Sequence, residues 1–114
     1  MTTNHRLIQF EPIFDALGDP SRRQILDLLA SGPRGVRQLS DDMPVSRSAV
    51  SQHLKVLKHA NLVTDTADGT RRIYRLNADG FEVLRSYLDI MWRDGLNAFA
   101  QAAREHATAE KDKP

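Results

Sequence analysis

The stretch VSRSAVSQHLKVL, residues 45–57, decides how this chain folds. Val50, Leu54 and Leu57 recur at i, i+4 and i+7, which is the spacing of one buried stripe along an α-helix. Ser46 is well placed as an N-cap, because its hydroxyl can accept a hydrogen bond from a backbone N–H of the first turn. The pattern therefore predicts an amphipathic helix from the Ser46 cap to about Ala60.

Upstream of this helix, residues 36–43 predict a short helix, and residues 44–46 form a tight break. Two helices joined in this way are typical of a helix-turn-helix. A further helix is expected over residues 10–17. Another begins at Pro20, with Asp19 as its N-cap, because the missing N–H of a proline costs nothing at the first helical position.

Downstream, the period of the pattern changes. Residues 62–66 and 72–76 resemble β-strands, and residues 67–70 contain Asp-Gly, a strong hairpin signal. A long amphipathic helix is expected from about Asp79 to Arg104. The predicted fold is mainly α with a small β-hairpin, which is a winged helix-turn-helix with four helices, a two-stranded wing and a long C-terminal helix.

The polar face of the 47–58 helix predicts contacts with double-stranded DNA. Gln52 can pair with adenine, Arg47 can pair with guanine, and Lys55 can reach a phosphate. Ser48 and Ser51 are short enough to allow close approach of the backbone. A polar helix face can also be merely solvated, so the neighbouring hairpin matters. It carries Arg71 and Arg72 beside its tip, and these arginines extend one basic footprint.

The distribution of charge supports this interpretation. The net charge of the 114 residues is only +1, but residues 20–75 hold ten Lys/Arg against five Asp/Glu. The remaining residues hold six bases and ten acids. A polyanion is therefore expected to approach the middle of the chain.

Three stretches resemble the ArsR-type winged-helix repressors: FDALGDPSRRQIL at residues 14–26, the helix at residues 45–57, and GTRRIYRL at residues 69–76. The resemblance covers about residues 10–105. It implies a sequence-specific transcription regulator, a homodimeric repressor that binds an inverted-repeat operator in double-stranded DNA. The full expected DNA-binding set is Ser46, Arg47, Ser48, Ser51, Gln52, His53, Lys55, Arg71 and Arg72. For His53, a phosphate contact and a local structural hydrogen bond both remain open.

The resemblance also implies a dimer interface built from the first and last helices. The apolar residues expected there are Phe10, Ile13, Phe14, Leu88, Met91, Trp92, Leu96 and Phe99. The alternative is that some of them belong to the core of a single protomer.

No metal site or cofactor is expected. The chain has no cysteine, so thiolate metal sites, disulfides and thiol-based sensing are excluded. Some members of the resembled family hold metal with an Asp/His/His/Glu set on the last helix. Asp89 and Glu105 could align with its acids, but Met91 and Ala102 occupy the histidine positions and His106 is out of register. A small molecule or a protein remains open as the effector.

An enzyme is not expected, because the chain has no Gly-rich phosphate loop and no HExxH motif, and the adjacent Asp41 and Asp42 would point about 100° apart on a helix. The runner-up is a winged helix used as a protein-interaction module, for which an exposed apolar patch in place of the Ser/Gln/Arg/Lys face and the wing arginines would be the sign.

The domain organisation expected is a flexible N-terminus at 1–9, a DNA-binding and dimerisation domain at 10–105, and a polar tail at 106–114. No stretch approaches the roughly 20 apolar residues of a membrane span. The first twenty residues do not resemble a secretory signal. A cytoplasmic location and no membrane partner are therefore expected.

Overall fold

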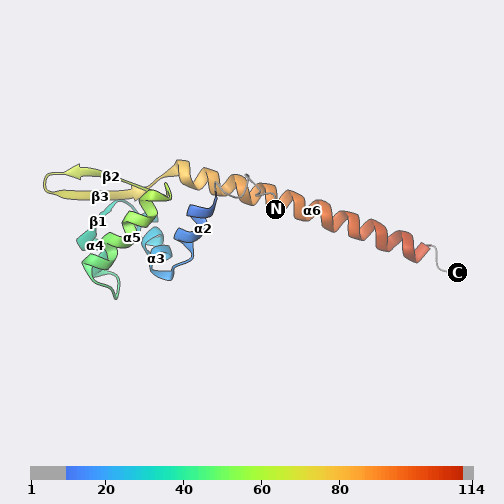
Figure 1. Cartoon of the computed structure of the whole chain (residues 1–114), viewed down its shortest axis with the longest axis horizontal. Helices are drawn as coiled ribbons and strands as arrows, with labels where there is room; N and C mark the ends of the chain where they lie inside the picture. The colour runs from blue at the N-terminus through green and yellow to red at the C-terminus, as the bar shows by residue number, and fades with distance from the viewer. Residues whose placement is uncertain (1–9, 112–114) are drawn as a thin grey trace, which may run out of the picture. The chain divides into compact units, whose positions relative to one another are not determined.

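The computed structural model describes residues 10–111. Within this part of the chain, helices α2 to α5 gather beside the β-hairpin, and α6 follows it along the chain (Figure 1). This mainly helical architecture with a small antiparallel hairpin confirms the predicted fold class. The elements are α2 (Glu11–Leu17), α3 (Pro20–Ala30), β1 (Arg34–Gly35), α4 (Val36–Asp41), α5 (Arg47–His59), β2 (Val63–Asp68), β3 (Arg71–Leu76) and α6 (Ala78–Lys111).

The start of α3 forms as the sequence predicts. Asp19 has an extended backbone, and its carboxylate accepts hydrogen bonds from the N–H groups of Ser21 at 2.8 Å and Arg22 at 3.3 Å. Pro20 takes the first helical position. The cap satisfies donors that the helix itself leaves unpaired, and so it fixes the corner between α2 and α3.

The helix-turn-helix is formed by α4 and α5. α4 ends at Asp41, slightly before the predicted Met43, because the N–H groups of Asp42 and Met43 turn back to the carbonyls of Leu39 and Ser40. Ser46 caps α5 as expected, with its hydroxyl accepting a hydrogen bond from the N–H of Ala49 at 3.1 Å.

The wing is the β2–β3 hairpin. Its register runs from Val63 opposite Leu76 to Asp68 opposite Arg71, so the turn consists of Gly69 and Thr70 alone. The sequence analysis placed a longer loop at residues 67–70, and the strands in fact extend further. Gly69 has φ +64°, which a side chain would disfavour and which suits the first position of a type II′ hairpin turn.

A third strand was missed by the sequence analysis. β1 pairs antiparallel with β3, and the sheet order is β1-β3-β2. Two residues between Pro33 and Val36 are too few to show an alternating pattern. This strand attaches the base of the wing to the start of α4.

The core lies between the helices and the base of the hairpin. Residues of α3 and α5 dominate it, and residues of α2, of α4 and of the start of β2 complete it. The largest side chains that are less than 2% exposed are Ile25, Leu39, Val50, Leu54, Leu57, Leu62 and Val63. The predicted stripe of α5 is therefore its buried face.

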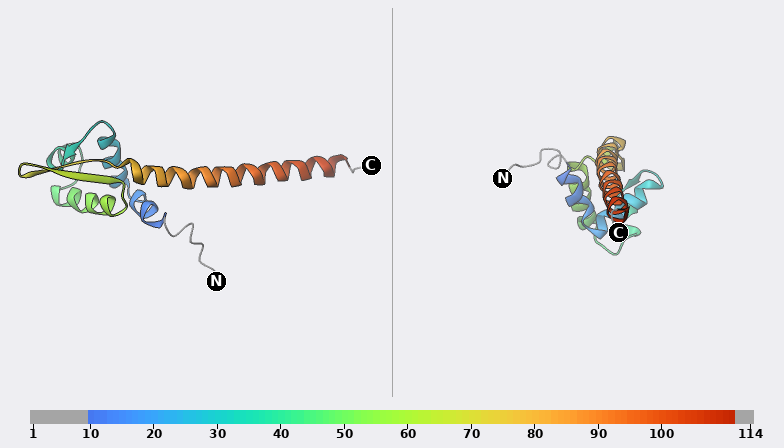
Figure 2. Two further views of the ribbon diagram at one scale, coloured as in Figure 1. Left: turned by 90° about the horizontal axis from the view of Figure 1, so that it is seen from above. Right: turned by 90° about the vertical axis from the view of Figure 1, so that its right-hand side faces the viewer.

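α6 continues past the predicted end at Arg104, as far as Lys111, and Figure 2 draws it as one continuous helix. The expected boundary between residues 105 and 106 therefore falls inside a helix. The chain forms two compact units, with the division between Leu84 and Arg85, and the expected domain over residues 10–105 stays a prediction. The expected flexible segment 1–9 and the last residues of the expected tail, 112–114, lie outside the described residues.

Candidate nucleic-acid interface

The exposed face of α5 carries five of the predicted DNA-binding side chains. Because Val50, Leu54 and Leu57 are wholly buried, the helix cannot rotate without exposing them, and its polar face is fixed outward. The exposed residues on that face are Arg47, Ser48, Ser51, Gln52 and Lys55. The side chain of Gln52, with its amide donor and acceptor, is available to the edge of a base.

Ser46 and His53 lie differently from these five. Ser46 is exposed, but its hydroxyl already serves as the cap of α5. His53 is half-buried and lies near the Asp19 carboxylate at the start of α3, where its charge helps to lower the pKa of Asp19. Ser46 therefore caps α5, whereas the role of His53 stays a prediction.

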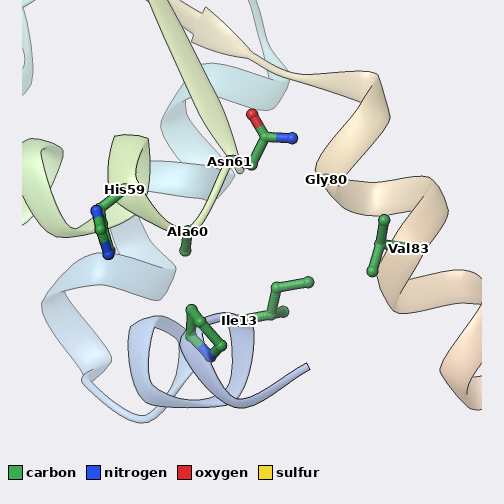
Figure 3. Close-up of a pocket in the computed structure, with 7 residues that line it drawn as sticks. Ile13, His59, Ala60, Asn61, Gly80 and Val83 are labelled. Carbon is green, nitrogen blue, oxygen red and sulfur yellow. The ribbon is translucent and has the colours of Figure 1, made fainter. Parts of the chain in front are cut away.

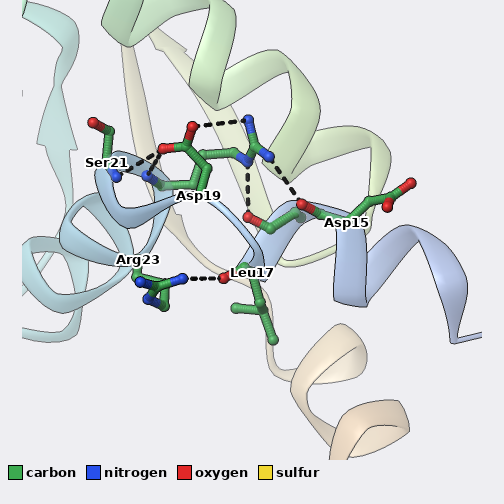
Figure 4. A network of polar contacts seen from close by, with 7 residues as sticks. Asp15, Leu17, Asp19, Ser21 and Arg23 are labelled. Carbon is green, nitrogen blue, oxygen red and sulfur yellow. Dashed lines mark hydrogen bonds and ion pairs between the residues drawn. The ribbon is translucent and has the colours of Figure 1, made fainter.

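The network around Asp19 uses arginines that the sequence analysis counted as part of a basic surface (Figure 4). Arg22 donates to the carbonyls of Ala16 at 2.7 Å and Asp15 at 2.9 Å, and Arg23 donates to Leu17 at 2.6 Å. These bonds satisfy the last carbonyls of α2. Desolvation raises the pKa of Asp19, but the N–H groups of Arg22 and Ser21 outweigh it, and the net pKa is lowered.

The guanidinium of Arg34 is also bound within the protein. It donates from Nε to the carbonyl of Leu28 at 3.0 Å and pairs with Asp42 at 3.4 Å. Within the described residues, the exposed cations of the α4–α5–wing region without a contacting acceptor are Arg37, Arg47, Lys55 and Arg71. The basic surface is therefore narrower than the sequence indicated, and it lies on the helix-turn-helix and the wing.

The register of the wing separates its two predicted arginines. Arg71 lies opposite Asp68 and Arg72 opposite Ala67, so the two side chains leave opposite faces of the hairpin. Arg71 is exposed at the tip. Arg72 Nε lies 3.3 Å from Asp65 Oδ2. One hairpin therefore presents a cation on each face.

Asp65 joins the wing to α5. Its side chain is only 6% exposed, and its other oxygen, Oδ1, lies 2.8 Å from Lys58 Nζ. The hydrogen bond from Lys58, opposed in part by desolvation and aided by the charge of Arg72, holds the pKa of Asp65 below its ordinary value. Sequence reasoning missed Asp65 and Lys58, because no local pattern shows that β2 returns alongside α5.

Two of the hollows in the first unit adjoin the helix-turn-helix. One, of about 440 Å³, lies between α4 and the wing, and Arg37, Arg71 and Arg72 are among the residues that line it. Arg37 was not among the predicted residues, because α4 and β3 are distant in sequence. The other, of about 270 Å³, is lined by the start of α2, the end of α5 and the first turns of α6, with His59 and Asn61 as its polar side chains (Figure 3).

The residues predicted for a dimer interface fall into two groups. Phe10 and Ile13 are 2% and 4% exposed, and Ile13 belongs to the protomer core, so these two have almost no surface left for a partner. The other residues are exposed apolar side chains, namely Phe14 on α2 and Leu88, Met91, Trp92, Leu96 and Phe99 on α6. Phe10 and Ile13 therefore offer little exposed surface, and their place in the expected interface stays a prediction.

Neither a metal centre nor a membrane span is found in the described part of the chain. Over residues 10–111, no three His, Asp or Glu side chains gather closely enough to hold a metal ion. No helix in that range is long and apolar enough to cross a membrane.

A helix-turn-helix with an outward polar reading face, followed by a basic β-hairpin, defines the winged helix-turn-helix class of DNA-binding protein. The model of the bacterial regulatory proteins of the arsR family matches residues 19–65. The HTH-type transcriptional regulator Rv2034 of Mycobacterium tuberculosis is 52% identical over 88 residues, which are 77% of this chain and 82% of that protein. The chain therefore belongs to the ArsR family and is a transcriptional regulator.

Other relatives agree with this assignment. The transcriptional repressor SdpR of Bacillus subtilis is 37% identical over 57% of this chain and 72% of its own length. An ArsR-like regulator from a Rhodococcus species has a TM-score of 0.81 at 28% identity and covers 98% of this chain and 100% of its own. A homodimeric winged helix-turn-helix DNA-binding domain from Mycobacterium bovis has a TM-score of 0.64 at 29% identity. The match covers 84% of this chain and 93% of that domain.

Proposed function

We propose that this regulator is a homodimeric repressor that reads an inverted-repeat operator through α5 and the wing. The observation that carries the proposal is the division of α5 into two faces. Its apolar stripe is wholly buried, and five side chains able to contact bases or phosphates are exposed.

Each of these side chains has a distinct role in the proposal. Gln52 and Arg47 contact base edges in the major groove, because amide and guanidinium groups match the hydrogen-bonding patterns of adenine and guanine. Ser48, Ser51 and Lys55 contact the backbone and fix the register of the helix on the duplex. Arg71 and Arg72 contact the adjacent minor groove or its phosphates.

Dimerisation through α6 explains why so many large apolar side chains are exposed on one helix. Leu88, Met91, Trp92, Leu96 and Phe99 are between 45% and 75% exposed in the protomer. The homodimeric relative from Mycobacterium bovis supports this part of the proposal. A two-fold dimer presents its recognition helices to half-sites about 34 Å apart, so the operator is an inverted repeat. Binding over a promoter in the cytoplasm would block the polymerase.

The experiment is fluorescence anisotropy of the purified protein against DNA from its own upstream region, with excess nonspecific competitor and at several salt concentrations. Tight, saturable binding that resists competitor supports the proposal. Binding that competitor abolishes leads to selection from a random-sequence pool. If the selection recovers no preferred sequence, the interaction-module alternative replaces the proposed function.

A further inference from the structure

Asp65 is the most deeply placed carboxylate of the wing, and each of its two oxygens contacts a different cation. Lys58 Nζ, from the last turn of α5, lies 2.8 Å from Oδ1, and Arg72 Nε, from β3, lies 3.3 Å from Oδ2. The side chain of Asp65 is 6% exposed, and acidic groups are seldom buried to this degree without partners. Three elements are thus joined through one carboxylate, which we call the Asp65 bridge.

The two cations of the bridge remain accessible to a further ligand. The side chains of Lys58 and Arg72 are 57% and 59% exposed. A guanidinium carries five N–H groups, and the contact with Asp65 is made through Nε, the nitrogen nearest the chain. In the described residues no other acceptor contacts Arg72. Its terminal nitrogens are therefore held outward in a defined orientation, and Lys58 Nζ is held beside them.

Stability alone is a weak explanation for this arrangement. Ion pairs whose cations stay more than half exposed usually contribute little net stability, because solvent screens their attraction and ordering the long side chains costs entropy. Placing a carboxylate beside a surface for a polyanion has an electrostatic cost as well. If Asp65 instead orients Lys58 and Arg72, both its ion pairs and its position beside the basic surface are explained.

We propose that Asp65 is a positioning residue for DNA binding, which fixes the wing against α5 and directs Lys58 and Arg72 together toward backbone phosphates. Lys58 becomes a further phosphate contact beyond the predicted set. The inference rests on the proposed function, because it assumes that α5 and the wing engage one duplex.

The proposal makes a distinctive prediction for Asp65→Asn. Removing a negative charge strengthens binding to any duplex, since nonspecific affinity is electrostatic. Loss of the bridge, however, leaves Arg72 and Lys58 unoriented, which weakens the operator complex selectively. The ratio of operator affinity to random-duplex affinity therefore falls by about tenfold or more, comparable with one mismatched base pair.

Asp68→Asn is the matched control. Asp68 lies on the same strand and is exposed, and within the described residues no ion pair involves it. Its substitution by asparagine removes the same charge as Asp65→Asn does. Its affinity for both duplexes is expected to rise together, so that the ratio stays constant. Both variants are measured against the selected operator and a random duplex at about 50 and 200 mM salt, with circular dichroism to verify folding.

Asp65→Glu provides a second test, since it keeps the charge and moves the carboxylate by one methylene. The ratio is expected to fall here without the general gain in affinity, and this variant decides the matter if Asp65→Asn does not fold. Equal ratios for Asp65→Asn, Asp68→Asn and the unmodified protein would overturn the inference and leave the proposed function standing. If the unmodified protein itself shows no operator preference, the proposed function fails, and this inference fails with it.

Discussion

Lys58 Nζ lies 2.8 Å from Asp65 Oδ1, and this contact joins the last turn of the recognition helix to the first strand of the wing. Helix α5 and the hairpin are therefore linked by polar contacts as well as by their shared core. Most of the consequences that can be tested concern how the reading surface is held in place.

The bridge predicts a pH dependence of stability. The pKa of Asp65 is lowered in the folded protein, mainly by the hydrogen bond from Lys58. A depressed carboxyl pKa stabilises the fold above the unfolded value of about 4 and loses that contribution as the pH falls through the folded value. The unmodified protein should therefore be more stable than Asp65→Asn at neutral pH, and the difference should close below about pH 4. Denaturant unfolding at a series of pH values measures it, and a difference independent of pH would contradict the role given to the charge.

Gln52→Ala should relax the choice of sequence. Losing one bidentate contact to a base costs about 1–3 kcal/mol of discrimination, whereas the salt dependence should hardly change because no phosphate contact is lost. Competition binding with operator variants measures the preference at each position. Gln24→Ala, an exposed glutamine on α3, is the control. An unaltered preference in Gln52→Ala would remove Gln52 as the reader.

Ser46 allows capping to be separated from DNA contact. Ser46→Ala removes the acceptor for the N–H of Ala49 and should lower the free energy of unfolding by about 1 kcal/mol. Ser46→Asp should retain the cap and most of the stability, because aspartate is an equally good N-cap. Its added negative charge should nevertheless weaken operator binding. Urea unfolding and anisotropy distinguish the two effects, and full stability in Ser46→Ala would show that the cap contributes little.

Gly80 is confined by the corner that connects the wing to α6. A Cβ at this position would overlap the carbonyl oxygen of Asn61, whose backbone has φ +64°. Asn77 fixes the same corner, donating from Nδ2 to Asn61 Oδ1 at 2.8 Å and from its N–H to the Leu62 carbonyl at 2.9 Å. Gly80→Ala should therefore destabilise the fold by about 1–3 kcal/mol despite the better helix propensity of alanine.

The matched variant for that corner is Asp79→Ala, which adds no atom there. It should cost at most about 1 kcal/mol, the usual contribution of an acid in the first turn of a helix. Thermal or urea unfolding of the two variants compares them directly. Equal stabilities would mean that the corner opens without cost.

Features governed by neighbours in sequence were the ones that could be predicted. The stripe of α5 and the caps at Asp19 and Ser46 depend on spacing within one or two helical turns, and all three were confirmed. The end of α6 was misplaced, because residues 105–111 contain no glycine or proline to stop a helix. Thr108 instead donates to the carbonyl of Arg104 at 3.0 Å within the continuing helix.

What could not be predicted depends on contacts between distant elements. Arg22 and Arg23 looked like part of a basic surface, but the corner between α2 and α3 directs them to carbonyls of the preceding helix. Likewise, the sequence placed Arg71 and Arg72 together, and only the strand register separates them onto opposite faces. The pairing of Arg72 with Asp65 then follows from that register and from the packing of β2 beside α5.

Trp92 offers the most direct test of the proposed dimer. It is 69% exposed in the protomer, and a tryptophan buried at an interface commonly contributes about 2 kcal/mol or more to association, roughly 30-fold in the dissociation constant. Trp92→Ala should therefore shift the monomer–dimer equilibrium toward monomer in sedimentation at decreasing concentration. Asn97→Ala, about 140° around the same helix and exposed, is the control and should leave the equilibrium unchanged. A dimer unaffected by loss of Trp92 would place the interface on another face of the protein, and the spacing of the operator half-sites would then have to be derived from that face.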